Sequence, residues 1–261
     1  MTSADWVRGL LAGVLAGVAG GLFGVGGGLI LVPLLTGFFR LSQHEAHGTS
    51  LAVIGPTALA ALLVYGASSQ VGWATALVVA LPSVWTARAG ARWAARTSPS
   101  GLKRAFALFL LIVAIRLAWR TPPVAESPLL DGLPRLVFVL CLGAAVGLLS
   151  GYMGVGGGVL AVPGFTLWLG MVQQAAQGTS LGVILFTAPA GAIEHARHGH
   201  VVWRLVPALA LGGMAGAPAA SWLVQRLPHE WLVRSFALFL VANAVTLWAR
   251  SRVPRVAAPD G

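Results

Sequence analysis

The chain has 261 residues, of which 57% are hydrophobic and only 9% charged, and its mean hydropathy is +0.83. A soluble domain has about 25% charged residues, so this composition excludes a water-facing globular surface and fits a chain that faces lipid. The net charge of +10 comes from basic residues that lie between apolar segments, which is typical of membrane topology signals and argues against nucleic acid as a partner.

Apolar segments follow one another along the whole chain. They lie at 6–23, 25–39, 48–66, 72–95 and 102–119, and again at 134–153, 155–169, 178–195, 201–224 and 231–249. Four segments in each half are long enough to cross about 30 Å of hydrocarbon as helices. The second segment of each half is short, is led by glycines and contains Pro33 or Pro163. We therefore predict an all-α polytopic membrane protein with 8–10 transmembrane segments, two of them short and broken.

The two halves are homologous, so that position n of the first half corresponds to position n + 130 of the second. Residues 13–60 align with 143–190 without a gap and with 22 identities in 48 positions. The same offset still holds at Trp73 and Trp203, which indicates duplication. We predict a first transmembrane repeat at 1–120, a proline-rich linker at 121–133 and a second repeat at 134–261, all within one integral membrane domain.

The distribution of Lys and Arg indicates how the halves are oriented. With five crossings per half and a cytoplasmic N-terminus, 12 basic residues lie inside and 5 outside. With four crossings per half, the same 17 residues divide 8 against 9. The positive-inside rule favours the first arrangement, in which the halves are inverted repeats and both termini are cytoplasmic. Whether the short segments cross or re-enter stays open.

Each short segment begins with the run Gly-Val-Gly-Gly-Gly, at 24–28 and at 154–158. Consecutive glycines leave backbone N–H groups accessible to a ligand, and the helix that follows adds the positive end of its dipole. Interrupted segments at matching positions of two halves are a sequence pointer to the binding site of a transporter. Packing is the alternative role, and we assign to it the glycines spaced by four upstream of each run, namely Gly13, Gly17, Gly21, Gly143, Gly147 and Gly151.

The blocks Gly-Thr-Ser-Leu at 48–51 and 178–181 are predicted helix starts, whose hydroxyls either cap the helix or bind an oxyanion. Five residues before each block stands a glutamine, whose amide can donate to an oxyanion or serve as loop polarity. The predicted substrate-binding residues are therefore Gly24, Gly26, Gly27, Gly28, Gln43, Thr49, Ser50, Gly154, Gly156, Gly157, Gly158, Gln173, Thr179 and Ser180.

Two other polar clusters contain histidines, and neither is predicted to bind a metal. The run His44-Glu45-Ala46-His47 is one residue short of a zinc-binding helix motif and has no such counterpart at 174–177, so no metal site is predicted. The histidines at 195, 198 and 200 stand beside Glu194 at a helix end, where we expect a solvated interfacial cluster. We predict no catalytic residue, no metal and no cofactor.

The duplicated constellation resembles the sulfite exporter TauE/SafE family. It comprises the glycine run, a Val-Pro nine residues after the first glycine, and the Gly-Thr-Ser-Leu block, and the likeness extends over about 13–119 and 143–248. The resemblance implies export or uptake of small sulfur-containing anions such as sulfite. The chain departs from the pattern at Leu81-Pro82-Ser83, where the second half keeps Leu211-Gly212-Gly213.

These observations favour a secondary transporter of small anions, in particular sulfur-containing ones, in the bacterial inner membrane. Its expected partners are the anion and the lipid bilayer, and a homodimer stays open. A membrane-embedded enzyme would need a Ser/His, paired-carboxylate or metal constellation within the apolar segments, where the sequence offers none. A structural membrane protein would not need duplicated glycine runs. The substrate, the direction of transport and the coupling ion stay open.

Overall fold

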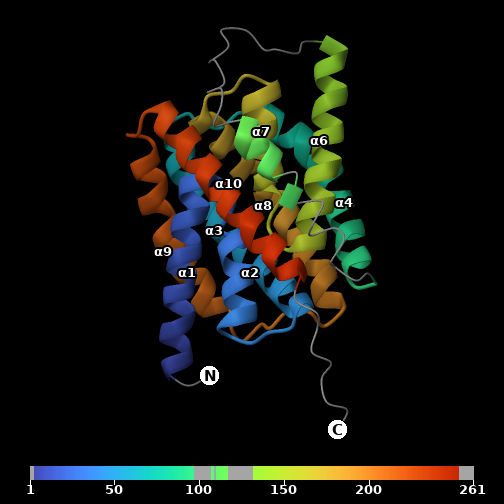
Figure 1. Ribbon diagram of the computed structural model, residues 1–261, viewed down its shortest axis with the longest axis vertical. Helices are drawn as coiled ribbons and strands as arrows, with labels where there is room; N and C mark the ends of the chain where they lie inside the picture. Colours follow the sequence, from blue (N-terminus) through green and yellow to red (C-terminus); the bar gives the residue numbers. More distant parts are fainter. Residues whose placement is uncertain (1–2, 97–106, 109, 117–131, 253–261) are drawn as a thin grey trace.

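The computed structural model describes residues 3–96, 107–108, 110–116 and 132–252, and within these the chain is helical. The linker predicted at 121–133 lies almost wholly outside the described residues, as do parts of the segment predicted at 102–119. The helices (Figure 1) are α1 (Ser3–Phe23), α2 (Gly28–Gly37), α3 (Gln43–Ala67), α4 (Trp73–Ala94), α6 (Gly132–Met153), α7 (Gly158–Trp168), α8 (Gln173–Arg197), α9 (Val206–Val224) and α10 (His229–Arg252).

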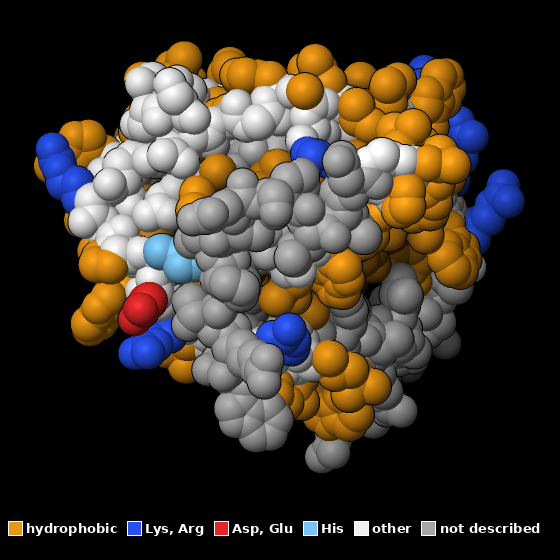
Figure 2. All heavy atoms as spheres, turned by 90° about the horizontal axis from the view of Figure 1, so that it is seen from above, with side chains coloured by type: hydrophobic (Ala, Val, Ile, Leu, Met, Phe, Trp, Pro, Cys, Tyr) orange, Lys and Arg blue, Asp and Glu red, His pale blue; other side chains and the backbone are white. Residues whose placement is uncertain are grey.

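The helices confirm the prediction of a polytopic membrane protein. Within the described residues, five of them are long and apolar enough to cross a membrane, namely α1, α3, α6, α8 and α9. The short helices α2 and α7 have 10 and 11 residues, which corresponds to about 15 Å, or half of a hydrocarbon core. Seen from above, hydrophobic side chains occupy much of the perimeter and charged ones are few and scattered (Figure 2).

The main helix–helix contacts join the two halves of the chain. Helix α1 packs on α9, and α6, which stands in the second half where α1 stands in the first, packs on α4. Helix α3 packs on both α8 and α9, and α8 also packs on α4. Each of these contacts thus has a counterpart in which the halves exchange roles. In Figure 1, α1 rises from the N-terminus at the bottom while α6 descends from the top, so these two helices run in opposite directions.

Glycines bring these paired helices into backbone contact. On α1, a Cβ atom at Gly13, Gly17 or Gly21 would collide with the carbonyl oxygen of residue 209, 213 or 217 of α9. On α6, a Cβ atom at Gly143, Gly147 or Gly151 would collide with that of residue 79, 83 or 87 of α4. The acceptor positions again correspond under the offset that relates the halves. The predicted packing role of these six glycines is confirmed, and it matches the small-residue interfaces of membrane helices.

We predict that Gly17→Val and Gly147→Val each prevent stable folding. The added side chain meets the backbone of another helix, which cannot rotate away, so we expect a loss of about 3 kcal/mol or more. The measurement is the monodisperse fraction of detergent-solubilised protein in size-exclusion chromatography. Gly66→Ala is the matched control, because a Cβ atom there meets nothing within 4 Å. A normal yield of either valine variant would show that the helices are farther apart than described.

Candidate functional site

Two glycine loops, 24–28 and 154–158, connect α1 to α2 and α6 to α7. The first, third and fourth residues of each loop have positive φ angles: 66°, 71° and 85° in the first loop, and 68°, 85° and 77° in the second. This backbone conformation is costly for residues with a Cβ atom and routine for glycine. The duplicated Gly-Val-Gly-Gly-Gly run therefore encodes the same unwound connection in both halves.

The two loops touch each other. A Cβ atom at Gly28 would lie 2.7 Å from Cα of Val155, and one at Gly158 would lie 2.6 Å from the carbonyl oxygen of Gly24. Each loop also abuts the opposite half's long helix, because Gly24 contacts Gln177 of α8 and Gly154 contacts His47 of α3. Side chains at these positions would force the two halves apart.

Several backbone N–H groups of the loops are left without a partner among the described residues. The N–H groups of residues 25–27 and 155–159 donate to no carbonyl or side chain in that part of the protein. The helices α2 and α7 begin at residues 28 and 158, so their N-terminal dipole ends lie at the same place. Unsatisfied donors beside two helix N-termini form an environment that favours negative charge.

Apolar side chains pack closely against the glycine loops. The position of a Cβ atom on Gly26 lies 2.7 Å from Cγ2 of Ile54 and 3.4 Å from that of Ile184, two isoleucines at equivalent places in α3 and α8. A side chain at Gly27 would collide with the carbonyl of Ala16, and one at Gly157 would lie 2.6 Å from Cγ1 of Val146. Substitutions at these glycines would therefore disturb packing as well as the backbone donors.

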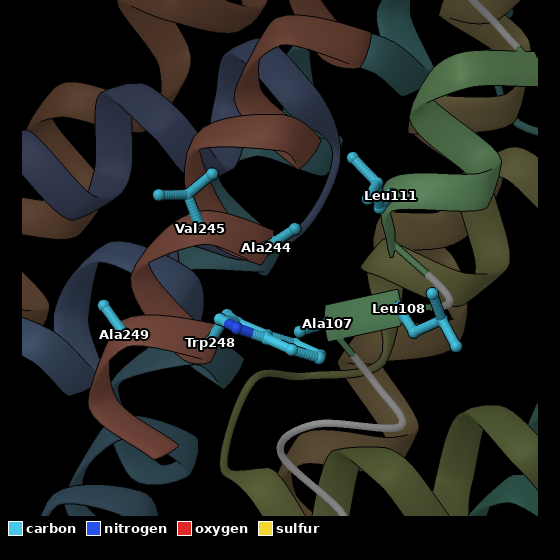
Figure 3. A pocket seen from close by; sticks show the side chains of 7 residues that line it. All are labelled: Ala107, Leu108, Leu111, Ala244, Val245, Trp248 and Ala249. Atoms are coloured by element: carbon cyan, nitrogen blue, oxygen red, sulfur yellow. The ribbon is translucent and has the colours of Figure 1, made fainter. Parts of the chain in front are cut away.

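A pocket of about 550 Å³ lies away from the glycine loops, between α10 and the segment around residue 108 (Figure 3). The described residues that line it carry no charge, so it suits an apolar chain rather than an anion. These residues are Ala107, Leu108, Leu111, Ala244, Val245, Trp248 and Ala249.

The hydroxyls of the Gly-Thr-Ser-Leu blocks are not helix caps, which corrects one of their two predicted roles. Helix α3 begins five residues earlier, because Ser42 caps it in a reciprocal capping box with Glu45. Helix α8 likewise begins at Gln173. The hydroxyls consequently lie about two turns into each helix, and all four residues are fully buried.

Three of these four hydroxyls bind the opposite half. Thr49 Oγ1 accepts from the backbone N–H of Val202 at 2.9 Å, and Thr179 Oγ1 accepts from that of Gly72 at the same distance. Ser180 Oγ donates to the carbonyl oxygen of Gly24 at 2.8 Å and so holds the first glycine loop. Ser50 Oγ, its counterpart, is buried and has no hydrogen-bond partner in the described part of the chain.

The two predicted glutamines are the first residues of α3 and α8, and their environments differ. Gln43 Nε2 lies 2.9 Å from His47 Nε2, and His47 contacts the second glycine loop. Gln173 is fully buried, and none of the described residues pairs with its amide nitrogen or its amide oxygen. Its backbone N–H donates to His229 Nδ1 at 3.1 Å. The structure thus places Gln43 near a loop and Gln173 in a separate polar site at the start of α10.

The expectation of a solvated cluster at the end of α8 is wrong for two of its members. His195 is fully buried and Glu194 is 4% exposed. Glu194 pairs with Arg92 of α4 at 2.8 Å and with Arg197 at 3.5 Å. No group of three or more metal-ligating side chains occurs in the part of the chain that the structure describes.

A family model described as "Sulfite exporter TauE/SafE" matches residues 9–247 of the chain. The chain belongs to the sulfite exporter TauE/SafE family. Curated relatives are named probable membrane transporter proteins: one from Xylella fastidiosa is 28% identical over 98% of this chain and its own full length. YunE from Bacillus subtilis is 28% identical over 89% of this chain and 93% of its own, and one from Methanocaldococcus jannaschii is 29% identical over 71% and 70%. No solved structure matches significantly. The protein is therefore a multi-pass membrane transporter.

We predict that Thr49→Val and Thr179→Val each lower the thermal stability of the purified protein. Either change leaves a backbone N–H of the opposite half unpaired, which costs about 1–3 kcal/mol. Thr57→Val is the matched control in α3, because the Thr57 hydroxyl donates to the carbonyl of Val53 in its own helix. Equal melting temperatures for all three variants would contradict the cross-half role of the two threonines.

Proposed function

We propose that this transporter carries small anions, and in particular sulfur-containing anions such as sulfite or organosulfonates, across the bacterial inner membrane. The observation that carries the proposal is the pair of touching glycine loops, whose N–H groups at residues 25–27 and 155–159 have no partner among the described residues. One helix N-terminus contributes up to about 2 kcal/mol to binding a negative charge when partly buried, so two that face one anion contribute up to about 4 kcal/mol.

The placement of acidic residues supports an anionic substrate. Within the described part of the chain, carboxylates occur only at Asp5, Glu45, Glu194 and Glu230, each within a few residues of a helix end. Glu194, the buried one, is already paired with arginines. A carrier of organic cations would place a carboxylate at membrane depth. The name of the family, sulfite exporter, gives separate support for sulfur oxyanions.

The proposal is tested by counterflow in proteoliposomes, with sulfite, methanesulfonate, sulfoacetate and acetate against choline. Vesicles preloaded with unlabelled anion should take up the labelled anion, and choline should not exchange. Exchange of quaternary ammonium compounds without exchange of any of these anions would refute the proposal.

We further expect Ser50→Ala to raise the KM for the anion about tenfold or more while leaving the melting temperature equal or higher. An unpartnered buried hydroxyl costs stability in the free protein, whereas a hydrogen bond to a charged ligand is worth about 1.5–3 kcal/mol. Ser180→Ala is the comparison, because it removes the hydrogen bond to Gly24 and should lower stability. An unchanged KM for Ser50→Ala would remove this residue from the binding site.

The proposed topology has both termini in the cytoplasm and inverted halves. The opposite directions of α1 and α6 support it (Figure 1). The test uses His198→Cys in a Cys141→Ser background. Inverted halves place position 198 in the cytoplasm, so a membrane-impermeant maleimide added to intact cells should not label it. Parallel halves place it outside and predict labelling. Ser68→Cys is the control, since both arrangements place this residue outside and predict its labelling.

A further inference from the structure

His195 holds the end of α6 just before the second glycine loop. Its Nε2 atom lies 2.8 Å from the carbonyl oxygen of Gly151, three residues before the loop begins. A carbonyl oxygen only accepts, so Nε2 carries the hydrogen, and the neutral ring has an unprotonated Nδ1. That Nδ1 atom is buried, and no described residue forms a hydrogen bond with it. One vacant basic nitrogen is therefore present beside the loop.

The equivalent position in the first half is a tyrosine that makes the same contact. Tyr65, which aligns with His195, donates through its hydroxyl to the carbonyl oxygen of Gly21 at 2.9 Å. Gly21 in turn aligns with Gly151 and stands three residues before its own loop. A phenol keeps its proton at neutral pH, whereas an imidazole gains or loses one in this range. Only one of the two equivalent contacts is thus chemically able to respond to protons.

Neighbouring histidines connect His195 to the surface. The ring of His200 lies 5.8 Å from that of His195, and the exposed His198 lies 5.9 Å from His200, centroid to centroid. No hydrogen bond joins these rings among the described residues, so proton transfer between them would pass through a water molecule. Partial burial, followed by electrostatic repulsion from neighbouring histidines, lowers the pKa of His200, which favours its neutral form as an intermediate proton carrier.

If the ring of His195 were protonated, no carboxylate among the described residues would be available to pair with it. The adjacent Glu194 is paired with Arg92 and Arg197. Glu45 is held in the capping box of α3. An anion bound at the glycine loops would supply the missing negative charge. Besides Tyr65, the titratable and charged groups on α3 and on the connection from α8 to α9 are His44, Glu45, His47, His198, His200 and Arg204.

We propose that His195 binds the proton that moves together with the anion, which makes the protein a proton–anion symporter. This inference rests on the proposed function. A proton from water passes through His198 and His200 to Nδ1 of His195, Nε2 keeps its hydrogen, and the same proton leaves Nδ1 for water on the other side. Because linkage is reciprocal, the anion strengthens proton binding by the factor by which the proton strengthens anion binding. One monovalent anion and one proton cross without net charge.

The test uses wild-type proteoliposomes and methanesulfonate, which stays ionised throughout the pH range, so its own titration cannot imitate coupling. An imposed difference of one pH unit should accumulate it about tenfold in the more alkaline compartment, since one unit is a factor of ten in proton activity. Counterflow at equal pH is measured in parallel. Absence of counterflow for methanesulfonate and for sulfite would refute the proposed function, whereas counterflow without accumulation would refute symport.

His195→Gln and His195→Tyr should lose the tenfold accumulation, and the melting temperature of each purified variant shows whether it folds. The tyrosine variant copies the non-titrating contact of Tyr65. Tyr65→Phe is the matched control, because it removes the equivalent contact to Gly21, together with the hydrogen bond to Gln177, and should retain accumulation. Accumulation by a His195 variant would exclude His195 as the proton site.

Should both His195 variants fail to fold, the wild-type protein still provides a test. Adding methanesulfonate to weakly buffered, purified protein at pH 7 should cause uptake of about one proton per protein, read with a pH dye. His200→Gln should slow this uptake at least several-fold without changing its extent. Binding without proton uptake would overturn the proposal.

Discussion

Backbone contact between helices from opposite halves is the constraint on which the rest of the structure depends. Glycines at equal spacing let α1 approach α9 and α6 approach α4 until their backbones touch. In lipid, where apolar side chains gain little by leaving their solvent, such close packing is a main source of helix association. With these pairs in place, the ends of α1 and α6 are held where the two glycine loops meet, and the loops cannot adopt an ordinary helical conformation.

The equivalence of positions was readable from the sequence, but the contacts between them were not. The constant offset between the halves indicates that Gly24 corresponds to Gly154, yet it does not indicate that one loop lies against the other. Helix α3 starts five residues before its predicted start, because Ser42 and Glu45 form a capping box there. Buried Glu194 pairs with Arg92, which is remote in sequence, and no local sequence pattern predicts such a partner.

The halves share their glycines and differ in their polar partners. Ser180 binds a loop carbonyl while Ser50 has no partner among the described residues, and Tyr65 stands where the other half has His195. Glycine positions are constrained by backbone geometry, which is the same in both halves. The polar positions are not fixed by that backbone geometry, so they can differ between the halves while the glycine loops stay alike.

The pairing of helices from opposite halves also sets an order of assembly during synthesis. Helix α1 leaves the ribosome first, but its partner α9 begins only at Val206. The glycine face of α1 therefore stays uncovered until most of the chain has been made. Helix α6 meets a different situation, because α4 precedes it and is already inserted. The amino-terminal half therefore cannot complete its packing alone. A chain truncated before Val206 would leave the glycine face of α1 free to associate with other membrane helices, so correct folding of the whole protein requires its last third.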